Sequence, residues 1–212
     1  MVKQLLFRLA KAPWMGRAVG LAFRYCAWAI PVKKVFCSKD ILAFEHPRPA
    51  YPNHVIISPR KPVQTLLHMA EHAGDFIKIW DAVQAIRAKH PAYHDGFTLV
   101  ANGGKRQEVQ QVHFHLLTDH VMVEDCTGPA GSVVFCNDGV CVTEHPQLRW
   151  ACHLVIQPAG QPTDAYFEGV LRCLDRLNGR YGLVPQGYSL VYQQTGDRAR
   201  PVFYIAAGKR IK

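Results

Sequence analysis

The sequence predicts an α+β protein that is built from two similar modules, and three observations lead to this prediction. Short runs of β-branched and apolar residues stand between glycine and proline turns, a pattern typical of antiparallel strands. Residues 75–89 instead carry apolar side chains at helical spacing. The order of strands and helix in the first half then recurs in the second half, which indicates a duplicated module.

Matching residues in the two halves lie at fixed offsets. The offset is 99 for Val35, Phe36, Cys37, Glu45, His46, Pro47, His54, Ile57 and Pro59, which recur as Val134, Phe135, Cys136, Glu144, His145, Pro146, His153, Ile156 and Pro158. It falls to 91 for the helix at residues 76–86 and the strand at residues 96–100. One connection must therefore be eight residues shorter in the second half.

The second copy differs from the first in its histidines. Carried along the chain, the offset of 91 places Tyr204 opposite His113 and Ala206 opposite His115. We therefore expect the second copy to have lost its chemistry. His46 and His54 both persist in the second copy, which favours a structural role for His46 and leaves the role of His54 open.

Basic charge is concentrated near the N-terminus. Residues 1–39 hold eight Lys and Arg residues and no acid, which accounts for nearly all of the formal net charge of +9. The remainder is close to neutral, so a nucleic-acid-binding surface is not expected. Residues 1–29 predict a basic amphipathic helix that is too short to span a bilayer. It could be an interfacial membrane anchor, a helix that packs on the core or a protein partner, or a cleavable targeting peptide.

Composition indicates how large a core the chain can bury, and cysteine usage indicates its cellular compartment. A chain of 212 residues with 49% apolar content can bury a substantial core, in one domain or two small ones. Its seven cysteines include no C-x-x-C pair, which favours reduced thiols in the cytoplasm over a disulfide framework. We expect small buried side chains at Cys26, Cys37, Cys126, Cys136, Cys141, Cys152 and Cys173.

The candidate chemistry lies in residues 107–117. Alternation there predicts a strand with Gln111, His113 and His115 on one face and apolar residues on the other. Two imidazoles on one strand face serve as half of a metal site, as a nucleophile with a helper, or simply as half-exposed polar residues.

A glycine turn precedes this stretch. The strand at residues 96–100 is followed by Asn102, Gly103 and Gly104, so the two strands form a hairpin. Backbone N–H groups at such a turn, beside Lys105 and Arg106, suit a phosphate group.

These residues resemble the motif of the histidine-triad (HIT) family of nucleotide hydrolases and transferases. That motif has three histidines at alternate positions, followed by two apolar residues and preceded by an asparagine and a glycine-rich turn. The corresponding positions here are Gln111, His113, His115, Leu116 and Leu117, with glutamine in place of the first histidine. Upstream, residues 30–36, 41–44 and 53–59 resemble the opening strand and the next hairpin of the family, in the same order.

The resemblance implies two HIT-like modules, each with a five-stranded antiparallel sheet and a principal helix. Family members commonly pair as dimers whose sheets join, and a fused tandem would supply the same arrangement within one chain. We therefore expect an intrachain pseudo-dimer that works as a monomer. Its parts would be the extension at residues 1–29, a module with the active site at 30–125, and a degenerate module at 126–212.

The resemblance also implies covalent catalysis that requires no metal or other cofactor. His113, as a neutral imidazole, would attack the α-phosphorus of a purine nucleotide derivative and form a nucleotidyl-histidine. His115 would hydrogen-bond a phosphate oxygen, beside Gln111 in the catalytic set. The implied nucleotide-binding residues are Asn102, Gly103, Gly104, His54, Phe44 and Glu108.

Three positions depart from the family pattern. Gln111 can hydrogen-bond but cannot relay a proton. Glu108 stands where the family has Ser or Thr, and its carboxylate would repel an anionic substrate unless it is paired. His46 stands opposite the family's ribose-binding acid, so the choice of nucleoside stays open.

The sequence thus predicts a nucleotide phosphoramidate or dinucleoside polyphosphate hydrolase, with hydrolysis favoured over nucleotidyl transfer. It would be cytoplasmic, either free or peripheral at a membrane. An alternative is a catalytically weak nucleotide-binding scaffold that residues 1–29 dock to a membrane or larger complex. A third possibility is a zinc-dependent hydrolase, because His68, Glu71 and His72 form an H-x-x-E-H motif at the end of a short helix predicted at residues 63–71. No third ligand follows in a recognisable pattern.

Overall fold

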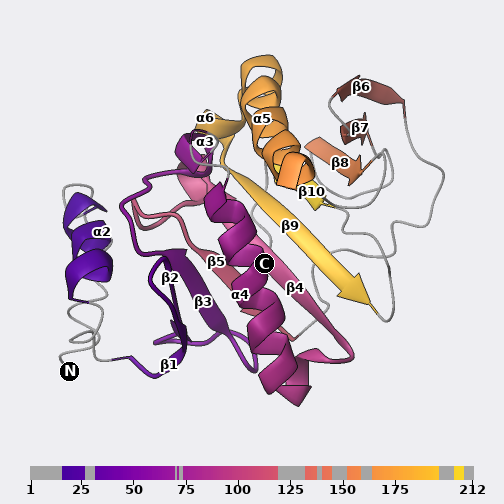
Figure 1. Ribbon diagram of the computed structural model, residues 1–212. Coiled ribbons are helices and arrows are strands. Elements are labelled where there is room, and N and C mark those ends of the chain that lie inside the picture. The colour runs from indigo at the N-terminus through magenta and orange to yellow at the C-terminus, as the bar shows by residue number, and fades with distance from the viewer. Residues whose placement is uncertain are drawn as a thin grey trace.

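The computed structural model describes residues 16–26, 32–69, 71, 74–118, 132–137, 140–144, 152–158, 164–195 and 203–207. Within these residues ten strands form one sheet, in which every pair of neighbouring strands is antiparallel (Figure 1). The predicted α+β class with antiparallel strands is therefore confirmed.

The strands divide evenly between the two halves of the chain. The first half holds β1 (Lys34–Cys37), β2 (Ile41–Glu45), β3 (Val55–Pro59), β4 (Gly96–Gly103) and β5 (Phe114–Leu117). The second half holds β6 (Val133–Asn137), β7 (Val140–Glu144), β8 (Cys152–Pro158), β9 (Tyr188–Thr195) and β10 (Phe203–Ala207). The helices are α2 (Gly16–Tyr25), α3 (Leu66–Met69), α4 (Gly74–Lys89), α5 (Asp164–Tyr181) and α6 (Leu183–Gln186), with 3₁₀ turns η3 (Pro91–Tyr93) and η4 (Gly104–Arg106).

The two halves of the sheet follow one order. From its outer edge the first half runs β1-β2-β3-β5-β4, and the second half runs β6-β7-β8-β10-β9. They meet where β4 pairs with β9, in a register centred on Val100 opposite Val191. The outer pair of each half has a register shift at the corresponding place, after Lys34 in β1 and after Val133 in β6.

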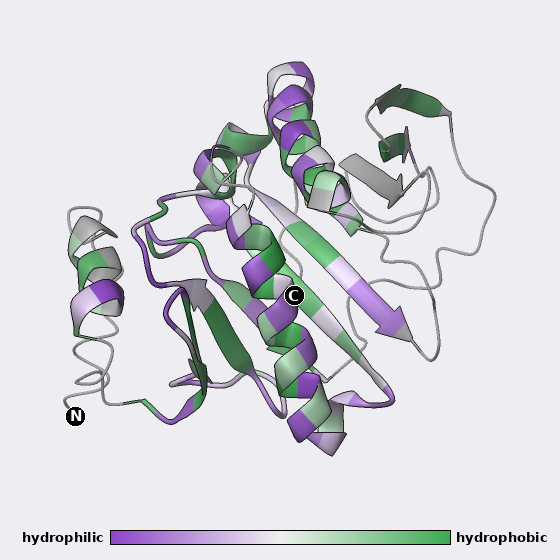
Figure 2. Ribbon diagram, viewed as in Figure 1, coloured by the Kyte–Doolittle hydropathy of each residue, from purple (hydrophilic) through white to green (hydrophobic). Residues whose placement is uncertain are grey.

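Helices α4 and α5 cover one face of the sheet and form the main core with it (Figure 1). Phe76 of α4 lies at its centre, with ring centroids 5.4 Å from Phe114 and 5.5 Å from Phe203. Strand residues alternate between this core and the opposite face. In β3, for example, Val55 and Ile57 enter the core, whereas Ile56 faces the other way. Figure 2 shows the resulting apolar character of β2 and β3.

Helix α4 is the helix predicted at residues 75–89. The apolar stripe of this helix is buried as expected, at Phe76, Ile79, Val83 and Ile86. Asp75 in its first turn lies 2.6 Å from the Lys61 ammonium group, and the last turn carries two basic residues. Both charge placements favour the helix because its N-terminal end is partially positive and its C-terminal end partially negative.

Three predicted elements have different bounds in the structure. The strand expected at residues 107–117 is confined to β5, and residues 107–113 form no strand. The backbone there bonds elsewhere: Val112 N–H donates to Val63 O, and Ser58 Oγ donates to Val112 O. The opening strand begins at Lys34 rather than residue 30. The helix expected at residues 63–71 is reduced to the single turn α3.

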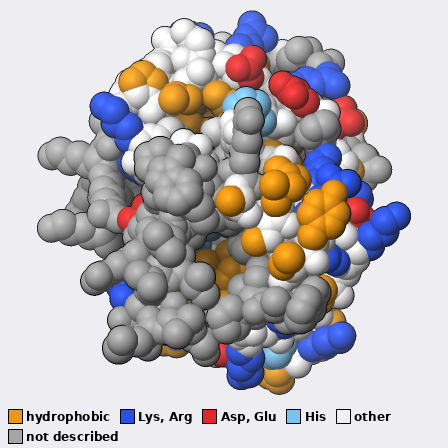
Figure 3. Space-filling model, turned by 90° about the vertical axis from the view of Figure 1, so that its left-hand side faces the viewer, with side chains coloured by type: hydrophobic (Ala, Val, Ile, Leu, Met, Phe, Trp, Pro, Cys, Tyr) orange, Lys and Arg blue, Asp and Glu red, His pale blue; other side chains and the backbone are white. Residues whose placement is uncertain are grey.

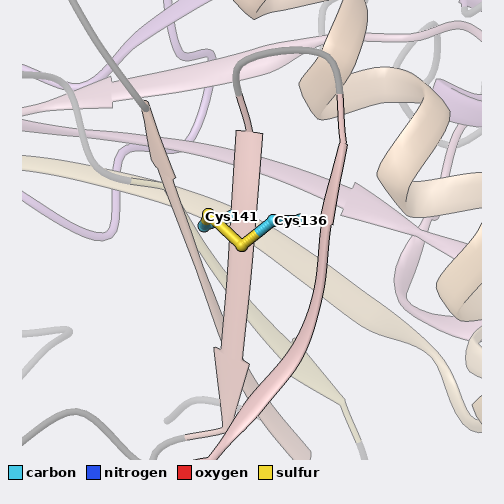
Figure 4. The surroundings of a disulfide bond; sticks show 2 residues. All are labelled: Cys136 and Cys141. Atoms are coloured by element: carbon cyan, nitrogen blue, oxygen red, sulfur yellow. A yellow bond between two sulfur atoms is a disulfide. The ribbon is translucent and has the colours of Figure 1, made fainter.

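The prediction of reduced cysteines is wrong for one pair, because Cys136 and Cys141 form a disulfide (Figure 4). They face each other across the β6–β7 hairpin with Cα atoms 4.1 Å apart, close enough for a bond. Cys26 and Cys37 are exposed free thiols, and only Cys173 of the described free cysteines is buried as expected. Cys126 lies outside the described residues, as does the side chain of Cys152.

Helix α2 is the described part of the predicted N-terminal extension, together with Cys26; residues 1–15 and 27–29 lie outside. The guanidinium of Arg60 donates to the carbonyl of Arg24 at 2.8 Å. Leu21 and Tyr25 are 49% and 63% exposed. On this side of the molecule hydrophobic side chains lie beside Lys and Arg side chains (Figure 3). No helix among the described residues is both long enough and apolar enough to cross a membrane.

Candidate functional site

A row of side chains crosses the sheet on the face opposite α4 and α5. Phe44 is paired with Ile56, Ile56 with His115, and His115 with Val100. Directly paired residues of antiparallel strands point to the same face with Cβ atoms about 4.5–5.5 Å apart. Phe44 and Ile56 belong to a small apolar cluster apart from the main core. His115 therefore stands beside an apolar surface that includes Phe44.

His54 and His115 form the centre of the site. The Nε2 atom of His54 lies 2.8 Å from Nδ1 of His115, so one proton is shared between the two rings. His54 is 8% exposed and directly precedes β3. Asn53 before it has a left-handed backbone conformation (φ 49°), and its carbonyl accepts a hydrogen bond from the Tyr93 hydroxyl. Tyr93 thereby holds the loop that presents His54.

His46 joins this pair from the end of β2. Its backbone N–H donates to the carbonyl of His54 at 2.8 Å, and the two rings stack with centroids 4.2 Å apart. Its Nδ1 accepts a hydrogen bond from the backbone of Arg48. The sequence favoured a structural role for His46, and this bond fits such a role. The stacking of His46 within the cluster was not predicted from the sequence.

His113 is fixed by a backbone hydrogen bond. Its Nδ1 lies 2.8 Å from the carbonyl oxygen of Gln111. A carbonyl only accepts, so Nδ1 carries the proton and the neutral ring has its lone pair on Nε2. The ring centroid lies 5.0 Å from that of His115. The two histidines thus lie side by side, as predicted, although only His115 is in a strand.

Burial keeps these imidazoles neutral. Burial lowers the pKa of His54 to about 3, and the neighbouring His46 and His113 add to this effect. The pKa of His115 lies well below its usual value, chiefly through burial and then through the nearby histidines. Burial also lowers the pKa of His113, although the Gln111 carbonyl and the Glu108 carboxylate oppose it. At pH 7 all three rings are therefore neutral.

Gln111 lies outside β5, and hydrogen bonds hold its side chain. Its side chain is 1% exposed and bonds to the segment that follows β3. Its Nε2 donates to the carbonyls of Pro59 and Lys61, each at 3.0 Å, and its Oε1 accepts from Val63 N–H. The Gln111 side chain thus fixes the backbone before β5. Its backbone carbonyl, rather than its side chain, contacts His113.

The glycine turn packs against the second half of the chain. Gly103 lies so close to the Tyr188 ring that a Cβ atom would overlap it. Gly104 has a φ of +58° and lies equally close to the Val184 backbone. The Ser189 hydroxyl donates a hydrogen bond to Asn102 Oδ1 at 2.7 Å. The –NH₂ group of Asn102 is thus the part of this side chain that can donate a hydrogen bond.

Arg106 completes this connection. Its Nη1 donates to Ser189 Oγ and to the carbonyl of Ala206, both at 3.0 Å. The sequence placed Arg106 beside a phosphate, whereas the structure binds this guanidinium nitrogen to β9 and β10. Glu108 is exposed and lies close enough to His113 to affect its pKa. The contribution of Ser189 was not predicted from the sequence.

The alignment of the two halves at β10 requires a correction. His115 pairs with Ile56 and Val100, whereas Tyr204 pairs with Val155 and Val191. Ile56 corresponds to Val155 at the offset of 99, and Val100 corresponds to Val191 at the offset of 91. Tyr204 therefore occupies the place of His115 rather than that of His113. The offset thus falls to 89 at this strand, and Phe203 corresponds to Phe114. Of the other repeated histidines, His145 lies outside the described residues.

The zinc motif on the predicted helix at residues 63–71 is only partly described. His68 is exposed, and its Nδ1 lies 2.7 Å from the Thr65 hydroxyl. Glu71 is exposed, and His72 lies outside the described residues.

Comparisons with known proteins agree with this arrangement. Residues 28–122 match the model of the HIT domain. This range includes all four histidines of the site. The protein HitA of Neisseria gonorrhoeae is 32% identical over 97 residues, which are 44% of this chain and 90% of HitA. This chain belongs to the HIT family.

Solved structures resemble this HIT protein beyond the matched domain. The ADP-glucose phosphorylase of Arabidopsis thaliana, with bound ADP-glucose, has a TM-score of 0.60 and 10% identity, covering 90% of this chain and 80% of that one. A structure described as a uridylyltransferase has a TM-score of 0.56 and 16% identity, covering 82% of this chain and 77% of the other. At such low identity these likenesses show the fold.

Proposed function

We propose that this HIT protein hydrolyses a nucleotide phosphoramidate or a dinucleoside polyphosphate through a nucleotidyl-histidine at His113. The observation that carries this proposal is the bond from His113 Nδ1–H to the Gln111 carbonyl. It leaves the lone pair of the neutral ring on Nε2, where an imidazole attacks phosphorus. A low pKa keeps that lone pair free of a proton at pH 7.

The reaction has two displacements. Nε2 of His113 forms a bond to the α-phosphorus, and the bond from phosphorus to the leaving amine or phosphate breaks with its electron pair. The leaving group takes up a proton from the solvent. Water then attacks the same phosphorus, and the bond from phosphorus to Nε2 breaks with its electron pair returning to His113. The nucleoside monophosphate leaves, one proton returns to the solvent, and His113 is neutral again.

Neighbouring groups would stabilise the charge on the phosphoryl oxygens. His115 and the –NH₂ group of Asn102 can donate, and Phe44 with Ile56 offers an apolar surface to the base. Gln111 supports the reaction through its carbonyl, which holds His113, and through its buried side-chain bonds. Glu108 is exposed, so its charge is screened by water and repels an anionic substrate only weakly.

We further propose that residues 30–125 and 126–212 are two HIT-like modules that form a pseudo-dimer, of which only the first is competent. Three observations support this: the common strand order, the central pairing of Val100 with Val191, and the bonds from Arg106 to the second half. A chain that supplies its own partner is expected to be a monomer in light scattering.

Rapid mixing followed by an acid-free quench and intact-mass measurement tests the enzymatic proposal. The substrates are adenosine and guanosine phosphoramidates and the dinucleoside polyphosphates. We expect an adduct of nucleotide mass on the wild type and on His68→Ala, and none on His113→Ala. His68 is a matched control because it is an exposed histidine away from the cluster. Substrate loss without any adduct, or loss of activity in His68→Ala, would contradict the proposal.

A second candidate is a nucleotide-binding scaffold that α2 docks to a membrane or a protein complex. The exposed Leu21 and Tyr25 beside Arg24 favour it, because such a surface suits an interface. It predicts nucleotide binding with neither an adduct nor turnover, and loss of docking when residues 1–29 are removed.

A further inference from the structure

His46, His54 and His115 converge on one point of the sheet face. Each ring offers one ligand nitrogen, and these three nitrogens lie within 4.8 Å of one another. This is the one such group of three or more His, Cys, Asp or Glu residues found in the described part of the chain. His113, the proposed nucleophile, is not among them.

The sheet register explains why these residues meet. Glu45 pairs with Val55, so His46 and His54 lie side by side at the loop end of the β2–β3 hairpin, joined by the bond from His46 N–H to His54 O. Two residues after His54, Ile56 pairs with His115. Because side chains alternate along a strand, His54 and Ile56 point to one face, and His115 points to it as well.

We propose that His46, His54 and His115 bind a divalent transition-metal ion of the zinc type. Three neutral imidazoles and a fourth open position make a ligand set that such ions take. The nearest carboxylate along the chain, Glu45, is paired with Lys33 at 2.6 Å, and the cluster contains no oxygen ligand of the kind that calcium or magnesium requires. The inference goes beyond the proposed function and does not depend on it.

Binding requires a small rearrangement. With bonds of about 2.0–2.1 Å, the nitrogens of a tetrahedral site lie roughly 3.3 Å apart. The pair between His54 and His115 at 2.8 Å must open slightly, and the proton between the rings must move to an outer nitrogen. The His46 ring must move inward, which its position at the end of β2 permits because that residue is only half-buried.

Two features limit the loss of hydrogen bonds when the metal ion binds. His54 Nδ1 is buried and has no hydrogen-bond partner among the described residues, so a proton or a ligand on this atom displaces no protein bond. Metal binding breaks the hydrogen bond from Arg48 N–H to His46 Nδ1, whichever ring nitrogen holds the ion. An ion on Nδ1 takes the lone pair that accepts this bond. An ion on Nε2 leaves the ring proton on Nδ1, which can then no longer accept. Arg48 is exposed, so water can replace this acceptor.

Titration of metal-free full-length protein with Co²⁺, followed by displacement with Zn²⁺, tests the site. Visible absorption reports the coordination of Co²⁺, and calorimetry gives the Zn²⁺ stoichiometry and affinity. We expect one ion per chain in the wild type and in His113→Ala and His68→Ala. In His46→Ala and His115→Ala the affinity should fall at least tenfold, with circular dichroism confirming that each variant is folded.

Two results would overturn the proposal. One is the absence of binding to the folded wild type at micromolar protein. The other is binding that survives unchanged in both His46→Ala and His115→Ala, which would place the ion on other histidines. Because His113→Ala abolishes the proposed adduct but leaves this cluster intact, failure of the metal site and failure of the enzymatic proposal are distinguishable.

Discussion

The two halves of the sheet have the same strand order but different side chains at the position of His115. His115 in β5 and Tyr204 in β10 occupy corresponding places, each between two strands paired in the same register. Their neighbours Phe114 and Phe203 both point to the opposite face and contact Phe76. The face that packs on the helices is thus alike in both halves, whereas the other face has histidine in one half and tyrosine in the other.

This difference separates what packing requires from what chemistry requires. An aromatic residue facing Phe76 fills the shared core, so both halves need one at that position. Nothing in the backbone of β10 requires an imidazole at Tyr204. Burial raises the pKa of several tyrosines of the second half, including that of Tyr192 to about 12.

The largest expected effect follows from His113→Ala. Loss of the nucleophile should lower kcat/KM by at least about 10³-fold, because the covalent route is removed while binding remains. Steady-state kinetics with the best substrate found by mass measurement would test this. His68→Ala should retain wild-type rates, and comparable activity of the two variants would contradict the assignment of His113.

Much of the fold could be predicted because its signals are local. The apolar stripe from Phe76 to Ile86 marked α4, and the resemblance of residues 41–44 and 53–59 to the family marked the hairpin. The repeat at offset 99 holds in the paired strands, where Ile41 faces Pro59 and Val140 faces Pro158. The strand predicted at residues 107–113 failed because the Gln111 side chain and the Ser58 hydroxyl provide hydrogen bonds that alternation cannot reveal.

The candidate site was predictable in three of its four histidines but not in His46 or in its connections. His113 and His115 followed from their spacing, and His54 from its resemblance to the family. The correspondence of Tyr204 to His115 could not be read from the offset of 91. The connection before β10 is two residues shorter than the one before β5, so every later residue matches at an offset of 89. The disulfide between Cys136 and Cys141 needed the register of β6 and β7, since five residues of separation alone do not bring two thiols into contact.

Gly103→Ala should break the junction between the halves. The added methyl group would overlap the Tyr188 ring, which is 1% exposed and cannot move away freely. We expect a loss of about 2–3 kcal/mol in the free energy of unfolding, as for other overpacked cores. Urea denaturation would measure it. Gly74→Ala is the matched control, because a Cβ there meets nothing within 4 Å. Equal stability of the two variants would contradict the close packing.

Removing the disulfide tests a feature found in the second half alone. In the first half the corresponding pair is Cys37 and Leu42, which form no such bond. A loop this short contributes about 2 kcal/mol in the chain-entropy model. Cys136→Ser with Cys141→Ser should therefore lower the melting temperature, and a reducing agent should lower that of the wild type equally while leaving the variant unchanged. Sensitivity of the double variant to the reducing agent would refute this explanation.

The smallest effect concerns Tyr93, which holds the His54 loop in the first half. Tyr93→Phe removes its bond to the Asn53 carbonyl and should cost about 1 kcal/mol at pH 8. Burial raises the pKa of Tyr93 from 10 to about 12, so the folded state keeps the phenol proton between these values while the unfolded chain releases it. This contribution to stability is complete below pH 10 and is lost as the pH rises toward 12. The stability difference between wild type and Tyr93→Phe should therefore shrink from pH 9 to pH 11. A difference that stays constant over this interval would mean that Tyr93 ionises equally in both states.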